Sequence, residues 1–207
     1  MAFGNVFGKN SRQWDSSVTP VWLEVKGRKI AGGTINIAAY SKGDEIAPCA
    51  PIKLPVMGGT AVILDAFKVE ADIDTSATAV KLGKGIFGTL PAAGMIVGKV
   101  GANGTATKAA TLGTYTEGTG FAITAASLGA LSEGDLLYIC EAAGSNKAAV
   151  LPNGFSWREI YIDVDTPAYA TVAVVTKGQV LEDRVPTIPA IYKAAVPGVT
   201  FEKELSE

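Results

Sequence analysis

Histidine is missing altogether from the 207 residues of this chain. Its absence excludes Ser-His-Asp and Cys-His nucleophile systems and removes the commonest transition-metal ligand. Charge is also scarce, since Asp, Glu, Lys and Arg make up 18% of the sequence and the net charge is −2. The usual charged share is about 25%. A net charge of −2 gives no indication of the basic surface that nucleic-acid-binding proteins use. We therefore expect a protein that is not an enzyme, holds no cofactor or metal and binds no nucleic acid.

Long apolar runs and cysteines are few as well. No uncharged apolar run reaches the roughly 18 residues of a membrane span, so we expect no membrane association. The N-terminus lacks the pattern of a secretory signal, which predicts synthesis in the cytoplasm. Cys49 and Cys140 are the only cysteines, and both lie in apolar contexts. Two buried thiols are the expected state, because disulfides are rare in proteins made in the cytosol, and a single disulfide is the alternative.

Glycine and proline are plentiful instead, with 24 and 10 residues, which favours turns over long helices. Short strand signals alternate with these turns, and this pattern predicts a mainly β fold, a β-sandwich or barrel with little helix. Helical turns are expected at Ala125–Leu131 and Pro189–Val196, while Lys26–Lys29 (KGRK) has the composition of a turn. The expected strands are Val21–Val25, Thr34–Ile37, Ile52–Leu54, Ala61–Val69, Ala79–Leu82, Met95–Val100, Gly120–Thr124, Leu136–Cys140, Glu159–Val164, Ala170–Thr176 and Val199–Glu202.

Two parts are predicted along the chain: residues 1–40, an N-terminal arm with the first strands, and residues 41–207, a β-rich domain. Phe3, Phe7 and Trp14 lie in the arm, where neighbouring Gly and Asn residues break helical periodicity. Large aromatic side chains in such a segment cannot bury themselves locally. We therefore expect these three residues to pack on a partner or a neighbouring subunit, or on their own domain.

A literal G-x-G-x-x-G occurs at Gly83–Gly88 (GKGIFG). A dinucleotide site needs a helix directly after this motif and an acidic residue about 20 positions further on. The segment after the motif contains Pro91, which cannot extend a helix, and Ala102–Thr111 contains no acidic residue. We therefore interpret the motif as a glycine-rich β-turn.

Three carboxylates, Glu70, Asp72 and Asp74, alternate with Ala71 and Ile73. On a strand this spacing places all three on one face. A solvated face is the expected role, and a Ca²⁺ site or a contact with a neighbouring subunit is the alternative.

Aromatic residues alternate in a similar way at Phe155, Trp157 and Tyr161. Such a stripe is typical of a half-buried core. The alternative is a platform on which a sugar ring stacks.

Three segments share a plan in which a polar residue and Gly precede an apolar strand: Ser41–Ile46, Ser132–Leu137 and Thr176–Leu181. A tight turn that needs positive φ at Gly, followed by a strand, explains this plan. In the third segment the turn is expected at Lys177-Gly178.

The C-terminal region from Thr171 to Glu202 reads TVAVVTKGQVLEDRVPTIPAIYKAAVPGVTFE. An apolar strand, the Lys177-Gly178 turn, the charged Glu182–Arg184, an Ala-rich stretch and a terminal strand follow one another. This arrangement resembles the C-terminal end of head-fibre and capsid-decoration proteins of tailed bacteriophages, particularly those of gut Bacteroides phages. The stretch Phe121–Trp157 is similar to the strand, Gly turn, strand and Asn-Gly loop that precede this end in that family.

The resemblance implies a structural virion protein that is made in the host bacterial cytoplasm and binds the outside of the capsid. Its expected partner is the major capsid protein, and the arm with Phe3, Phe7 and Trp14 is the expected docking element. The family role also implies a homo-oligomer, and a trimer is favoured because a cyclic oligomer can sit on a matching symmetry axis. The alternative is a carbohydrate-binding or adhesive β-sandwich module of a phage tail or bacterial surface protein.

Overall fold

A computed structural model describes residues 21–38, 40–56, 59–99, 109–124, 128–145, 147–163 and 169–203. The fold is mainly β, as the sequence predicts, with strands in two six-stranded sheets and one small two-stranded sheet. The arm residues Phe3, Phe7 and Trp14 lie outside the described residues, so their predicted docking role stays a prediction. In the part of the chain that is described, no helix has the length and hydrophobicity of a membrane span.

The first sheet closes on itself as a barrel. Strand β1 pairs with β4, β4 with β3, β3 with β11, β11 with β13, and β13 returns to β1. β14 extends the sheet beside β13 and runs parallel to it. The bounds are β1 Trp22–Asn36, β3 Pro51–Lys53, β4 Thr60–Ile63, β11 Gly154–Ser156, β13 Tyr169–Leu181 and β14 Val199–Glu202.

The second sheet is built entirely from the chain between β4 and β11, so we call it the inserted sheet. Its strand order is β5-β10-β7-β8-β9-β6, with antiparallel neighbours throughout. A bridge between Val69 and Leu82, just after β5 and β6, brings its two edges together. The bounds are β5 Ala66–Lys68, β6 Ala79–Val80, β7 Ile96–Gly98, β8 Ala110–Thr116, β9 Gly120–Thr124 and β10 Leu136–Ile139.

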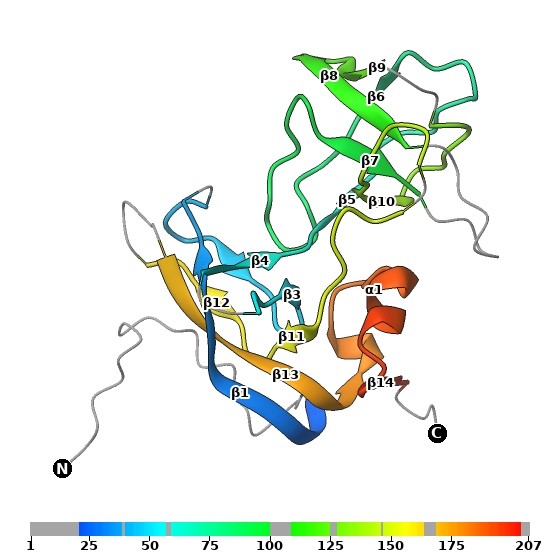
Figure 1. Cartoon of the computed structure of the whole chain (residues 1–207). Coiled ribbons are helices and arrows are strands. Elements are labelled where there is room, and N and C mark those ends of the chain that lie inside the picture. The colour runs from blue at the N-terminus through cyan, green and yellow to red at the C-terminus, as the bar shows by residue number, and fades with distance from the viewer. Residues whose placement is uncertain are drawn as a thin grey trace.

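Each sheet encloses its own apolar core. Phe155 and the inward valines of β13 lie in the barrel core, whereas Phe67 and Leu137 lie in the core of the inserted sheet. Figure 1 shows the barrel at the lower left and the inserted sheet above it, joined by the short passage from β4 to β5. That passage is Leu64-Asp65, and both residues are buried.

Three smaller elements complete the fold. The two-stranded sheet joins β2 (Glu45–Ile46) to β12 (Ile160–Tyr161), and a 3₁₀ turn, η1, spans Glu182–Arg184. The only α-helix in the described ranges is α1, Ala190–Ala195, which confirms the helical turn predicted at Pro189–Val196. The described part of the other predicted turn, Leu128–Leu131, is not helical. Helix α1 begins after Pro189 and ends before Pro197-Gly198, as the proline and glycine positions require. In Figure 1, α1 lies to the right of the barrel strands, above β14.

The prediction was wrong where long strands run through residues typical of turns. Lys26–Lys29 does not form a turn, because β1 continues through it and pairs with β13. Lys177-Gly178 is not a turn either, since both residues lie inside β13. The expected strand Ala61–Val69 is divided between the two sheets by Leu64-Asp65. The expectation omitted β8 and β11, whereas β9 and β14 have the predicted bounds.

Candidate functional site

A row of exposed, uncharged side chains lies on the outside of the barrel, on β4, β1 and β13. Thr34 pairs with Thr60 on one side and with Thr171 on the other. Asn36 pairs with Tyr169 in the next exposed row, and Val62 follows Thr60 on the same side of β4. We call these six exposed residues the outer face: Thr34, Asn36, Thr60, Val62, Tyr169 and Thr171.

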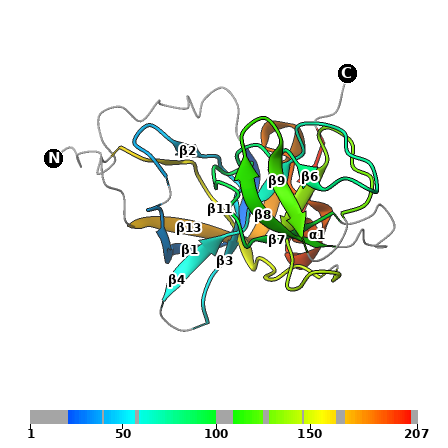
Figure 2. The ribbon, with the colours of Figure 1, turned by 90° about the horizontal axis from the view of Figure 1, so that it is seen from above.

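The strand period explains how this surface arises. Residues alternate between the two faces of a strand. The neighbours Ile35, Ala61 and Val172 therefore point into the barrel, where they are at most 3% exposed. The outer face keeps large side chains in contact with solvent, since Tyr169 is 63% exposed and Val62 51% exposed. Figure 2 shows β1, β4 and β13 extending to the side of the inserted sheet.

At one edge of the outer face, two arginine side chains contact the indole ring of Trp157. The guanidinium carbon of Arg28 lies 3.7 Å from the Trp157 ring centroid, and that of Arg158 lies 4.2 Å from it. Both guanidinium groups are therefore within cation–π distance of the same indole. We call Arg28, Trp157 and Arg158 the Arg–Trp clamp.

The clamp adjoins the outer face across β13. The Trp157 backbone N–H donates to the Ala173 carbonyl at 2.9 Å. Ala173 follows Thr171 by two residues, so it lies on the same side of the strand. Arg28 reaches Trp157 from β1, on the other side of β13. The structure thus separates the three aromatic residues of the predicted stripe: Phe155 is a core residue, Trp157 is half-buried with two guanidinium groups on its ring, and Tyr161 is 41% exposed.

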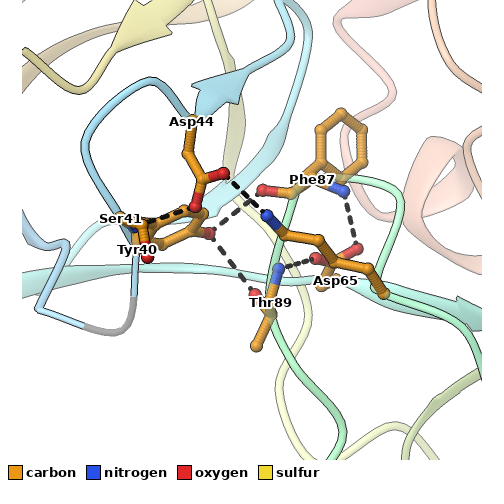
Figure 3. A network of polar contacts seen from close by, with 7 residues as sticks. Tyr40, Ser41, Asp44, Asp65, Phe87 and Thr89 are labelled. Carbon is orange, nitrogen blue, oxygen red and sulfur yellow. Dashed lines mark hydrogen bonds and ion pairs between the residues drawn. The ribbon is translucent and has the colours of Figure 1, made fainter.

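The G-x-G-x-x-G loop encloses a carboxylate of the chain itself. Asp65 Oδ1 accepts the backbone N–H of Phe87 at 2.9 Å, and Oδ2 accepts that of Thr89 at 2.9 Å (Figure 3). Asp65 Oδ1 also accepts the N–H of Ala66 at 2.7 Å. A Cβ atom on Gly85 would lie 2.3 Å from Asp65 Oδ2, so the carboxylate requires glycine there. The motif is therefore a glycine-rich turn that folds around Asp65, as the absence of a following helix predicts.

This loop ties the inserted sheet to the barrel. The Tyr40 hydroxyl donates to the Phe87 carbonyl at 3.1 Å (Figure 3), and the Tyr192 hydroxyl of α1 donates to the Asp65 carbonyl at 3.4 Å. Burial raises the pKa of Asp65, and the N–H donors of Phe87, Thr89 and Ala66 act in the opposite direction. The network is a structural joint between two sheets rather than a ligand cradle.

Two of the three predicted Gly turns have the same geometry. In Ser41–Asp44 and Ser132–Asp135 the Asp carboxylate accepts the Ser N–H at 2.9 Å, and the Asp N–H donates to the Ser carbonyl at 3.0 Å. Gly43 and Gly134 have φ of 93° and 90°, which confirms the predicted positive φ. The Asp44 carboxylate pairs with Lys84 of the glycine-rich loop at 2.9 Å (Figure 3), so the first turn also spans the joint.

The three alternating carboxylates point to solvent, but each has different neighbours. Asp72 Oδ1 accepts the Glu133 N–H at 2.6 Å, while Asp74 Oδ1 accepts the Ser76 N–H and hydroxyl at 2.7 Å. The Glu70 carboxylate lies against Gly83, where an added Cβ would be 2.8 Å from its Oε1. Within the described ranges, no group of three or more Cys, Asp or Glu side chains is arranged to hold a metal ion.

Glu70 also borders a small cavity on the inserted sheet. This cavity measures about 170 Å³ and is lined by Glu70, Lys81, Leu82, Tyr115, Gly118 and Gly120. Tyr115 is 57% exposed and packs its ring against Phe121 with 5.1 Å between the centroids. A solvent-facing aromatic ring beside an acid and an amine is a combination that can contact a polar ring-shaped ligand. The sequence interpretation did not single out Tyr115, because the strand that carries it was not expected.

Both cysteines are free and buried, which confirms the expected pair of thiols. Burial raises the pKa of the Cys49 thiol above its usual range and that of Cys140 to about 11. Cys49 is also the one non-glycine residue with positive φ, 64°, in the described part of the chain. Neither thiol has the lowered pKa or the exposure of a reactive cysteine.

The C-terminal unit closes the barrel, although not through the predicted turn. Val172, Val174 and Val180 are buried in the barrel core, as expected. Gly178 lies between β1 and β14, and a Cβ there would be 2.4 Å from the Glu24 carbonyl oxygen. Phe201 is half-buried and packs edge-on against Phe155 at 5.4 Å. Glu182 pairs with Lys193 of α1, so the charged segment forms a local ion pair.

No family model, curated protein or solved structure matches this chain.

Proposed function

We propose that this chain is a non-enzymatic structural protein of a phage virion, which binds the outside of the capsid as a decoration or head-fibre protein. The outer face is the observation that supports this role best. The resemblance of Thr171–Glu202 to capsid-decoration proteins supports the same role, and β13, most of which lies in that segment, contributes Tyr169 and Thr171 to the outer face. The partner in this proposal is the major capsid protein.

The composition of the outer face suits contact with a protein. Interface centres are depleted in Lys, Glu and Asp and enriched in aromatic residues and Arg. The outer face has Tyr169 and Val62 among four small or polar uncharged residues, and the two arginines of the Arg–Trp clamp adjoin it. Lys53 borders it on β3, where it pairs with Val62. The strands beneath are held in a closed barrel, so the surface is rigid before it binds.

A test uses purified protein and phage heads from which this protein is missing. Wild-type protein is expected to sediment with the heads. Thr171→Glu places a carboxylate on the outer face and is expected to weaken binding at least about tenfold, because a desolvated unpaired charge opposes docking. Thr116→Glu on β8 is the matched control, since Thr116 is also an exposed strand residue. Failure of the wild-type protein to bind heads would overturn the proposal.

The homo-oligomer belongs to the same proposal. A trimer would present three copies of the outer face to a symmetry axis of the shell, and the arm with Phe3, Phe7 and Trp14 would contact the shell or a neighbouring subunit. Light scattering of the free protein gives the mass, and deletion of residues 2–20 followed by the head-binding assay tests the arm. A monomeric mass would contradict the homo-oligomer. Unchanged affinity for heads after deletion of residues 2–20 would contradict a docking role of the arm.

A carbohydrate-binding module is the second candidate function, and the cavity beside Tyr115 favours it. Trp157 is unsuited to a sugar platform because it is half-buried and two guanidinium groups already contact its ring. Tyr115 is exposed, and Glu70 and Lys81 line the same cavity. Titration of the protein with soluble glycans, followed through chemical shifts of Tyr115 and Gly118, tests this alternative. Saturable shifts that Tyr115→Ala abolishes would favour it.

A further inference from the structure

We propose that the Arg–Trp clamp binds carboxylate groups of the protein that docks on the outer face, an inference that rests on the function proposed above. The clamp would take two acidic side chains from an extended segment of the partner. Its two arginines would thereby fix the orientation in which the uncharged outer face meets its partner.

The first step concerns the state of the two guanidinium groups. Each is exposed, and in the described part of the chain neither Arg28 nor Arg158 forms an ion pair with a carboxylate. A guanidinium group has five N–H donors and no acceptor. Contact with an indole face uses none of these donors in a conventional hydrogen bond, so both groups keep their capacity for carboxylates.

The second step concerns preorganisation. An arginine on a surface normally loses much rotamer freedom when it forms an ion pair, and this loss offsets most of the gain. Here cation–π contacts of 3.7 and 4.2 Å already hold both side chains on Trp157. The remaining entropy cost of binding an anion is therefore smaller than at an ordinary surface arginine.

The third step concerns spacing. Because the guanidinium carbons lie 3.7 and 4.2 Å from the Trp157 ring centroid, the two carbons are at most about 8 Å apart. Side chains at alternate positions of an extended strand are roughly 7 Å apart. Two carboxylates at positions i and i+2 of an extended partner segment therefore match the clamp, each accepting N–H donors from one arginine.

A protein carboxylate is favoured over a nucleic-acid phosphate by the surroundings. The adjoining outer face carries no positive charge to follow a phosphate backbone, and the chain has a net charge of −2. Glu24, four residues before Arg28 on β1, pairs with Lys26 at 2.8 Å. Such a surface repels a long polyanion and accepts a short acidic segment.

The test measures binding to the same phage heads over a range of salt concentrations. The double variant Arg28→Gln and Arg158→Gln is expected to bind at least about tenfold more weakly at low salt and to show a shallower salt dependence. The double variant Arg28→Lys and Arg158→Lys keeps both charges but loses the planar guanidinium groups that bind a carboxylate through two N–H donors. We therefore expect an affinity between those of wild type and the double Gln variant. Lys68→Gln with Lys147→Gln, which removes two exposed charges elsewhere, is the control and should bind like wild type.

The outcomes separate this inference from the proposed function. If wild-type protein binds heads and Thr171→Glu weakens binding, while the double Gln variant keeps wild-type affinity and salt dependence, the clamp proposal is wrong and the docking role survives. If wild-type protein does not bind heads, the proposed function itself fails. A short DNA duplex added as competitor should leave head binding unchanged, and displacement by the duplex would overturn the assignment to carboxylates. Melting temperatures of all variants should stay within a few degrees of wild type, since the clamp is exposed.

Discussion

The barrel and the inserted sheet are both closed by β pairing, but they differ in how far apart in the sequence their paired strands lie. Strands of the barrel come from both ends of the described chain, since β1 pairs with β13 along most of its length. Every strand of the inserted sheet comes from residues 66–139. The barrel therefore depends on contacts that are remote in sequence, and the inserted sheet on local ones. Local contacts form faster, so the inserted sheet is expected to fold first.

The two regions also use glycine differently. Gly178 has an ordinary strand conformation and is needed because a Cβ atom there would lie 2.4 Å from the Glu24 carbonyl oxygen of β1. Gly118, in the turn between β8 and β9, has φ of 79° and open space around its Cα. Gly178 thus permits close packing of two long strands, whereas Gly118 permits a turn.

The largest expected effect comes from removing one ring from each core. Phe155→Ala in the barrel and Phe67→Ala in the inserted sheet each delete a side chain that is 0% exposed, so each is expected to cost about 3–5 kcal/mol. Hydrogen exchange should show that Phe67→Ala lowers protection in β5–β10 more than in β1 and β13. Equal loss of protection in both regions would mean that the two cores unfold as one unit.

A smaller effect is expected from adding one methyl group at a matched pair of glycines. Gly178→Ala forces a Cβ against the Glu24 carbonyl oxygen and is expected to cost about 3 kcal/mol through displacement of β1. Gly118→Ala meets no atom within 4 Å and is expected to cost only about 1 kcal/mol through its positive φ. Urea unfolding measures both values. Similar costs at the two positions would contradict the distinction between close packing and turn conformation.

The joint between the two regions is probed by Asp65→Asn. An amide nitrogen next to the Thr89 N–H cannot accept its hydrogen bond, so a loss of about 1–3 kcal/mol is expected. The pKa of Asp65 is raised above the ordinary value of 3.8 by burial. Its contribution to the free energy of unfolding is therefore fully present below pH 3.8 and declines as the pH rises through the raised pKa.

The Asn variant lacks this titration. The stability difference between wild type and Asp65→Asn should accordingly be largest in acid and narrow as the pH rises. Chemical denaturation across this pH range gives the difference. A difference that widens with pH would show that the carboxylate is stabilised in its ionised form.

Sequence patterns predicted the local features of this fold and missed its remote ones. The positive φ of Gly43 and Gly134, the helix Ala190–Ala195 and the strand Val199–Glu202 each follow from residues that are close in sequence. The pairing of Lys26–Lys29 with β13 depends on residues at the other end of the chain, and so the turn-like KGRK was misinterpreted.

The candidate site illustrates the same limit. Thr34 and Asn36 alternate with buried isoleucines, which is a readable strand signal, but only the closed barrel places them beside Tyr169. Arg28 and Arg158 were not singled out, because nothing in the sequence brings both onto Trp157. Asp65 belongs to no recognisable sequence motif. Its role as acceptor for the Phe87 and Thr89 N–H groups is visible only in the folded glycine-rich loop.

The most direct test of the docking assignment compares the two regions in one experiment. A photo-crosslinking phenylalanine analogue replaces Tyr169 on the outer face or Tyr115 on the inserted sheet, two tyrosines that are 63% and 57% exposed. Each protein is bound to phage heads and irradiated. We predict that the protein carrying the analogue at Tyr169 crosslinks to the major capsid protein and that the protein carrying it at Tyr115 does not. Crosslinking from Tyr115 alone would contradict the assignment and move the docking surface to the inserted sheet.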